Sequence, residues 1–142
     1  MIVIKPLKYV SFILFFFLLV VGCGNAYNPK AQRDAIFKVH DEVMPKIGEV
    51  MELRRKALQK ASEIAEKEAD RAAQLRALAQ QLEQANNGMM SWMREWSKNS
   101  QKYMEMKAGA FEQVEYLKKE MERVTEVKEA INGAIAEAKK AL

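Results

Sequence analysis

The chain of 142 residues contains a single cysteine, Cys23, and a single histidine, His40. One cysteine excludes an intramolecular disulfide framework and any zinc site built from several cysteines. One histidine excludes a histidine-rich metal site and leaves little for acid–base catalysis. No succession of serine, histidine and acid suggests a catalytic triad. We therefore expect no enzymatic activity and no cofactor.

Proline (3 residues) and glycine (6 residues) are also scarce, and no stretch alternates apolar and polar residues with period two. This composition excludes collagen, low-complexity disorder and a β-sandwich with many turns. The missing alternation predicts that the chain has no β-strands. A chain of this length fits one domain, and its fold class is predicted to be all-α.

The first 22 residues differ from the rest of the chain. Lys5 and Lys8 precede an uncharged, mostly apolar run at positions 9–21. A membrane-spanning helix needs roughly 20 apolar residues, so this run is short for a span and suits the hydrophobic region of a signal peptide. We predict a signal peptide over residues 1–22. An ordinary secretory signal and an uncleaved anchor are the alternatives to the lipoprotein signal described next.

The signal ends in Val20, Val21, Gly22 and Cys23, which resembles the lipobox of bacterial lipoproteins. The resemblance implies that the peptide before Cys23 is cleaved, that its thiol is diacylated and that the new N-terminus is acylated. Two or three acyl chains give lasting attachment to a bilayer where one chain is marginal. By analogy with Gram-negative lipoproteins, Gly24 in place of aspartate favours an outer-membrane location. No acidic or lysine-rich run follows, so we expect the domain to face the periplasm.

Cleavage also changes the charge of the protein. It removes two of the 23 basic residues and none of the 19 acidic ones, which leaves the mature chain at +2. Opposite charges alternate along the rest of the sequence, as is typical of a solvated helical surface. A nucleic-acid partner is therefore not expected.

Residues 23–28 form a short lipidated tether, and residues 29–142 are predicted to form a helical domain. Asn28 is a favourable N-cap and Pro29 a favourable first residue for a helix that runs to about Glu66. Pro45 removes one backbone hydrogen bond within that helix, so we expect a kink there, or alternatively a helix restart. The apolar stripe of this first helix is Ile36, His40, Val43, Ile47, Val50, Ala57, Ala61 and Ile64.

A second helix carries apolar residues in unbroken steps of three and four. They are Leu75, Leu78, Leu82, Ala85, Met89, Trp92 and Trp96. Asn86–Gly88 is a turn signal in isolation, but the stripe is in phase on both sides of it. We therefore predict a continuous helix, with a turn at this point as the main alternative.

A third helix is predicted over about Ala110–Ala141. Its stripe is Phe111, Val114, Leu117, Met121, Val124, Ile131, Ile135, Ala138 and Leu142. The connection before it is bracketed by Ser97–Gln101 and Gly109. Tyr103, Met104 and Met106 within that connection either form an exposed apolar patch or tuck under the end of the bundle.

The break between the first two helices is placed near Glu68–Asp70 by length. A single helix from Pro29 to Trp96 would be about 100 Å long, and the third helix would cover only half of it. A break there gives three helices that bury all three stripes in an up-down-up three-helix bundle, with Asp70 as an N-cap. An antiparallel two-helix coiled coil is the alternative.

Three stretches carry a family resemblance: His40–Gly48 followed by Leu53, Ala85–Met93, and Tyr116–Lys119 with Val124, Val127 and Ile131. Their order and spacing resemble small bacterial lipoproteins that are often labelled "viral A-type inclusion protein". The label implies no viral function, and the resemblance implies no particular activity. The chain departs from the family pattern at Asn86–Gly88, where acidic residues are more usual.

Nine methionines are many for a chain of this length. His40, Met44, Met89 and Met93 supply the imidazole and thioether groups that suit Cu(I), and a tryptophan face can cap such a cation. The same residues at three and four spacing serve equally as core filler where helices meet irregularly.

His40, Asp41 and Glu42 are consecutive on a helix, so they do not converge on a hard metal ion. His40 is instead expected to be half-buried and hydrogen-bonded to a neighbour. The two carboxylates are expected to face solvent or to pair with lysines such as Lys38 and Lys46.

These patterns predict a membrane-anchored lipoprotein of the bacterial envelope with a structural or adaptor role. Its partners would be the bilayer, through Cys23, and another envelope protein or a second copy of itself. A periplasmic Cu(I)-binding module is the alternative function.

Overall fold

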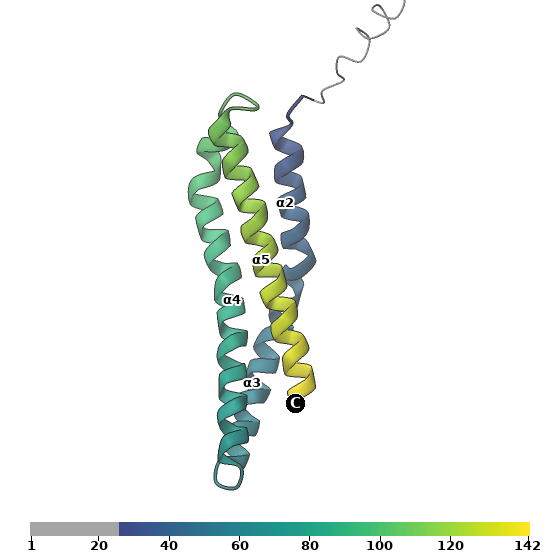
Figure 1. The fold of residues 1–142 in the computed structure, drawn as a ribbon, viewed down its shortest axis with the longest axis vertical. Helices are drawn as coiled ribbons and strands as arrows, with labels where there is room; N and C mark the ends of the chain where they lie inside the picture. Colours follow the sequence, from purple (N-terminus) through teal and green to yellow (C-terminus); the bar gives the residue numbers. More distant parts are fainter. Residues whose placement is uncertain (1–25) are drawn as a thin grey trace, which may run out of the picture.

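A computed structural model describes residues 26–142, and these form a slender bundle of three helical arms (Figure 1). The first arm consists of α2 (Pro29–Val43), the 3₁₀ turn η2 (Met44–Lys46) and α3 (Ile47–Ile64). The second arm is α4 (Ala69–Met104) and the third is α5 (Phe111–Ala141). The predicted all-α, up-down-up bundle is confirmed, and the alternative of a two-helix coiled coil is wrong. The signal peptide, Cys23 and the start of the tether lie outside the described residues.

The first arm begins as the sequence predicts. The side chain of Asn28 accepts a hydrogen bond from the Ala31 amide at 3.1 Å, and Pro29 is the first helical residue. This bond satisfies one of the amides that a helix leaves without a partner at its start.

Pro45 divides the first arm in two. It lies within η2, where a 3₁₀ turn replaces α-helical hydrogen bonding for three residues before α3 continues. Because proline has no amide hydrogen, the chain tightens locally and resumes its helix without reversing direction. The arm therefore changes neighbours along its length: α2 lies mainly against α5, and α3 mainly against α4.

The turn between α3 and α4 falls where length predicted it, but its cap differs. Backbone amides of Lys67 and Glu68 both bond to the carbonyl of Ile64, which ends α3. Glu68 is the N-cap of α4, and its side chain makes no capping bond. The prediction that Asp70 is the N-cap is wrong: Asp70 lies in the first turn of α4, where its carboxylate still complements the helix dipole.

Helix α4 runs without a break through Asn86–Gly88, as the phased stripe predicts. It also continues to Met104, so the prediction that the connection to the third helix begins at Ser97 is wrong. Its stripe keeps its register to Trp96, and one face of the helix beyond that point packs on α5 through Tyr103. Tertiary packing therefore overrides the weak helix propensity of Ser97–Gln101.

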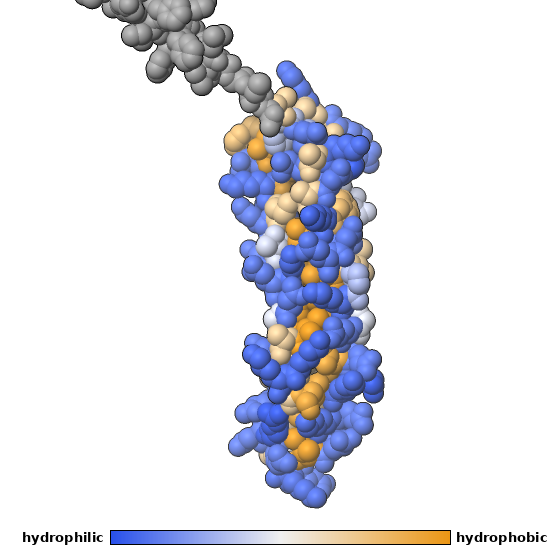
Figure 2. Space-filling view, turned by 90° about the vertical axis from the view of Figure 1, so that its right-hand side faces the viewer, coloured by the Kyte–Doolittle hydropathy of each residue, from blue (hydrophilic) through white to orange (hydrophobic). Residues whose placement is uncertain are grey.

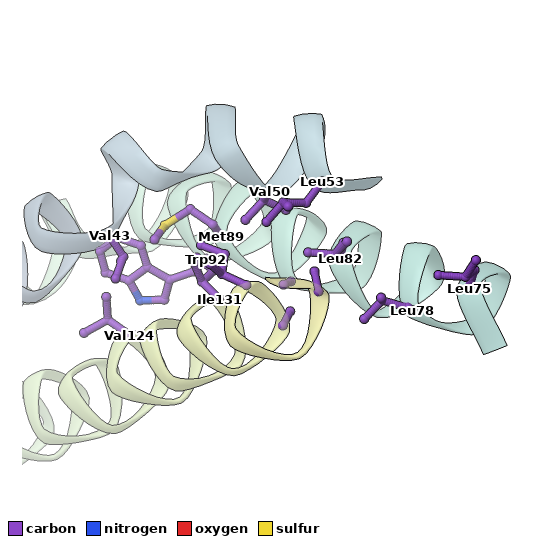
Figure 3. Close-up of a cluster of buried hydrophobic side chains, with 14 of the residues drawn as sticks. Val43, Val50, Leu53, Leu75, Leu78, Leu82, Met89, Trp92, Val124 and Ile131 are labelled. Carbon is purple, nitrogen blue, oxygen red and sulfur yellow. The ribbon is translucent and has the colours of Figure 1, made fainter. Parts of the chain in front are cut away.

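The core runs along the axis of the bundle. All seven stripe residues predicted for α4 are buried. Trp92 points between the arms toward Val43 of α2 and Val124 of α5, and Met89 lies beside it (Figure 3). Toward the α3–α4 turn, the small side chains of Ala57 and Ala61 of α3 and of Ala72 and Ala79 of α4 are buried among the leucines Leu53, Leu75 and Leu78. Small residues let two helices approach closely.

The buried face of α5 differs from the predicted stripe over its first turns. Phe111 is 76% exposed, and Val114 and Met121 are only partly buried. Two polar residues, Gln113 and Glu120, are buried in their place. Gln113 donates to the carbonyl of Tyr103 near the end of α4, and Glu120 accepts a hydrogen bond from Arg123 one turn along α5. Leu142, also placed on the stripe, is 37% exposed.

Within residues 26–142, no helix combines the length and the apolar character that a membrane span requires.

Candidate functional site

Six rings from all three arms lie in a continuous chain of ring–ring contacts, here called the aromatic cluster. It consists of Phe37 and His40 of α2, Trp92, Trp96 and Tyr103 of α4, and Tyr116 of α5. The Phe37 ring meets the Trp96 ring edge-on at 5.3 Å between centroids. The Tyr103 and Tyr116 rings are stacked at 4.0 Å. Ring pairs at such distances add stability beyond the apolar area that they bury.

His40 has two ring nitrogens in different surroundings. Nδ1 lies 2.8 Å from a carboxylate oxygen of Asp41, whose side chain is largely exposed. Nε2 is buried and has no hydrogen-bonding partner, and the Trp92 ring lies 5.6 Å from the imidazole. In the neutral tautomer with the proton on Nδ1, that N–H would donate a hydrogen bond to Asp41 and Nε2 would present a lone pair. The expectation that His40 is half-buried and bonded to a neighbour is confirmed.

The other copper candidates lie in or against the same hydrophobic core. Met89 is fully buried within it, and Met44 and Met93 are partly buried against it. His40 and Met44 come from the first arm, and Met89 and Met93 from α4. The structure thus brings the four residues to one region of the bundle. Among the described residues, no group of three or more His, Cys, Asp or Glu side chains is placed to hold a metal ion.

Glu42 pairs across the bundle and not with the lysines of its own arm. Its carboxylate accepts a hydrogen bond from Lys128 of α5, which lowers the pKa of Glu42 below its usual range. Lys46 donates to the side-chain oxygen of Asn132 at 2.6 Å, and Lys139 pairs with Glu49 at 2.6 Å. Asp41 and Glu42 are both exposed, as expected, but the lysine that pairs with Glu42 is Lys128 and neither Lys38 nor Lys46. These bridges join the first arm to α5 along one seam.

A shallow groove of about 740 Å³ lies between α4 and α5 beside the aromatic cluster. Glu120 is 3% exposed there, with one carboxylate oxygen bonded to Arg123 at 2.9 Å and the other buried without a partner. Arg123 also pairs with Glu95, and that hydrogen bond lowers the pKa of Glu95. The buried hydroxyl of Tyr116 has no partner, and burial followed by the charge of Glu120 raises its pKa.

Gln113 organises the loop between α4 and α5. Its amide nitrogen donates to the carbonyl of Tyr103 at 2.8 Å, and its amide oxygen accepts from the Gly109 backbone at 3.0 Å. Gly109 has a φ of 82°, which favours glycine. One buried side chain therefore holds both ends of the loop. Gln113 and Glu120 were missed because the stripe was drawn through apolar residues, although both keep three and four spacing with Leu117 and Val124.

The end of the bundle beside residue 26 collects aromatic and apolar side chains. Tyr27 lies against Gly109, with its Cβ 3.6 Å from the point where a β-carbon on that glycine would stand. Of the two interpretations of the connection, tucking is the one observed: Met104 packs against the core, and Tyr103 and Met106 are partly buried. Phe111 is the one large hydrophobic side chain at this end that is mostly exposed to solvent.

A second exposed apolar feature lies on α3. Met51 and Leu58 are 41% and 40% exposed, and they are seven residues apart on one face of the helix. Figure 2 shows apolar surface running along the length of the bundle between charged side chains. We call Met51 and Leu58 the α3 ridge.

No protein-family model, curated protein or solved structure matches this chain.

Proposed function

We propose that the protein is a lipid-anchored protein of the bacterial envelope with a structural or adaptor role. In this proposal residues 1–22 are removed, Cys23 carries the acyl chains, and the bundle extends into the periplasm from the outer membrane. The motif that ends at the only cysteine of the chain supports the anchor, and the resemblance to small bacterial lipoproteins agrees with it.

The α3 ridge is the observation that carries the adaptor role. Two exposed apolar side chains with a spacing of seven match the period at which helices pack in coiled coils. Arg55 lies beside the ridge, and Glu52 with its partner Lys56 provides both signs of charge there. The occupant that fits is an amphipathic helix of another envelope protein, with apolar residues of the same period.

No catalysis is proposed. The groove beside the aromatic cluster is shallow, and its buried carboxylate Glu120 is neutralised by Arg123. A general acid needs a proton-donating group, and a general base a proton-accepting group, within reach of a bound substrate; a charge-paired carboxylate is poorly suited to either task.

The anchor is tested by replacing Cys23 with serine. Cys23→Ser should release the protein from membranes and abolish labelling by a palmitate analogue. Persistence of either the membrane attachment or the label refutes acylation at this residue.

The adaptor role is tested by placing a photo-crosslinking residue at Met51 in cells, with the exposed Lys118 as the control position. We expect one discrete adduct from position 51, no adduct from position 118, and loss of the first when Leu58→Lys is added. An adduct of twice the protein's mass identifies a second copy as the occupant. Absence of any discrete adduct from position 51 contradicts the adaptor role.

Binding of Cu(I) is the second candidate function, and the unpartnered Nε2 of His40 favours it. Metal-binding histidines commonly donate their other ring N–H to a carboxylate, and Nδ1 of His40 lies 2.8 Å from a carboxylate oxygen of Asp41. Titration with Cu(I) under reducing conditions should then quench the Trp92 fluorescence with stoichiometric uptake, and His40→Ala should remove both effects. Unchanged fluorescence without uptake eliminates this candidate.

A further inference from the structure

One end of the bundle differs from the other in a way that fits a lipid surface. The end beside residue 26, which we call the proximal end, consists of Tyr27, the α4–α5 loop at 105–110 and Phe111, the first residue of α5. It carries Met106 and Phe111 and one acidic residue, Glu105. The opposite end, residues 65–70, has three acidic residues and no large apolar one. The two ends therefore present different surfaces to anything that the bundle approaches along its axis.

The length of chain before the bundle determines which end approaches the bilayer. Cys23 is four residues from Tyr27, and four residues reach at most about 14 Å when fully extended. Tyr27 itself is held against Gly109 in the α4–α5 loop. An acylated Cys23 thus keeps this loop within about 14 Å of the lipid headgroups.

Phe111 is the side chain that the bundle leaves out at this end. It is the first residue of α5 and 76% exposed, while every other aromatic residue among those described is at least partly buried. Aromatic side chains are favourable at the boundary between headgroups and acyl chains. Tyr27, half-buried against Gly109 at the same end, offers a ring of the amphipathic kind that is enriched at membrane interfaces.

We propose that the proximal end, which also holds Tyr27, rests on the bilayer with Phe111 inserted among the lipid headgroups. This inference depends on the proposed acylation of Cys23. The acyl chains supply the attachment, and Phe111 acts at the high local concentration that they create. The contact sets the orientation: α4, of 36 residues, extends about 54 Å away from the headgroups. The acidic end is then the part farthest from the membrane.

The experiment uses the full acylated protein in vesicles of phosphatidylethanolamine and phosphatidylglycerol. Phe111→Cys and, as the control, Leu58→Cys each receive a nitroxide label. Both residues are exposed, so neither change disturbs the core. The sulfur of Cys23 is held as a thioether when acylated, which leaves the introduced cysteine as the single free thiol.

Collision of each label with oxygen, which enters the bilayer, is compared with collision with a water-soluble nickel chelate. We expect the ratio of oxygen to nickel collisions to be several-fold higher at position 111 than at position 58. Equal ratios in protein that floats with the vesicles overturn the contact and leave the anchor standing. Spin–spin broadening at position 111 identifies a second copy as the occupant and also overturns it. Protein that fails to float, or that takes the label at Cys23, refutes acylation and the contact together.

Discussion

The two halves of the bundle differ in the size of the side chains that are buried between their helices. Near the proximal end, large rings fill the space between three arms, and Trp92 and Trp96 lie at its centre. Toward the α3–α4 turn, the buried alanines Ala57, Ala61 and Ala72 alternate with smaller apolar side chains than tryptophan, chiefly Leu53, Leu75 and Leu78. Since the distance between helix axes follows the size of the side chains between them, one repeating pattern gives two kinds of interface. The stability of the ring-filled half therefore depends on large buried side chains, and that of the alanine half on small ones.

The halves also differ in their polar groups. The ring-filled half buries the side chains of Gln113 and Glu120. In the alanine half, Arg71 donates to the carbonyl of Ala141, the last residue of α5, at 2.6 Å, and Lys60 donates to the carbonyl of Leu142 at 3.1 Å. Cations at that position also complement the negative end of the helix dipole.

Removing the largest ring should have the greatest effect. Trp92 is 2% exposed, so Trp92→Ala leaves a cavity between all three arms and should lower the free energy of unfolding by about 3–5 kcal/mol. Guanidinium denaturation followed by circular dichroism measures this loss. Lys118→Ala, at an exposed site, is the control. A loss under about 1 kcal/mol, smaller than any such cavity usually costs, would mean that the rings do not carry the stability of this half.

Adding volume should damage the alanine half. Ala61 is fully buried, so Ala61→Leu forces α3 and α4 apart and should cost about 1–3 kcal/mol. Ala73→Leu, at an exposed position of α4, controls for the change in residue type. Equal stability of the two variants in the same denaturation experiment would show that the interface has room for a larger side chain.

The buried amide of the ring-filled half is the next test. Gln113→Ala leaves the Gly109 amide and the Tyr103 carbonyl without their partner, which should cost about 1–3 kcal/mol. Hydrogen exchange at Gly109 should accelerate more than exchange in the middle of α4. The exposed Gln80 is the control for a glutamine-to-alanine change. Unchanged exchange at Gly109 would contradict the role assigned to Gln113 in this loop.

A stabilising change is available where the two halves meet. A β-carbon at Gly88 would lie 3.8 Å from Val127, an ordinary contact, so Gly88→Ala should raise stability by about 0.5–1 kcal/mol through helix propensity. Gly109→Ala, at a φ of 82°, should do the reverse. Thermal unfolding of the two variants decides the matter. A destabilised Gly88→Ala protein would show that α4 and α5 are closer there than the structure has them.

The smallest effect concerns alkaline pH. Because burial raises the pKa of Tyr116 in the folded state, its neutral hydroxyl adds stability that is fully present below about pH 10 and lost as the pH rises toward the folded pKa. Tyr116→Phe should therefore flatten the decline of stability above that pH. Tyr27, whose pKa burial also raises, leaves a residual slope. An unchanged slope in Tyr116→Phe would place the ionising group elsewhere.

The sequence predicted helices where apolar spacing was regular and failed where polar residues share in the core. The stripe of α4 was found in full because each of its members is apolar, and its phase carried the helix correctly through Asn86–Gly88. In α5 the rule that buried residues are apolar excluded Gln113 and selected Phe111. A polar side chain can be buried where it finds hydrogen-bonding partners, and the partner of Gln113 lies in another segment, at Tyr103.

Only part of the aromatic cluster could be predicted from the sequence, for a similar reason. Trp92 and Trp96 belong to the regular stripe, and their spacing predicted their burial. Phe37 and Tyr116 lie just outside the predicted stripes of their own helices. They join the cluster because the three arms pack against one another, and the pattern within a single helix does not predict such contacts between arms.

The 3₁₀ turn at Pro45 has a mechanical consequence. With α2 alongside α5 above the turn and α3 alongside α4 below it, a tether pulling on residue 26 along the bundle drags α2 lengthwise over α5. The Glu42–Lys128 ion pair and the Lys46–Asn132 hydrogen bond are then loaded at the same time, in shear, so that they share the force. A sideways pull would instead peel α2 away and break these two contacts in turn. We therefore expect the bundle to resist a pull along its axis better than a sideways pull.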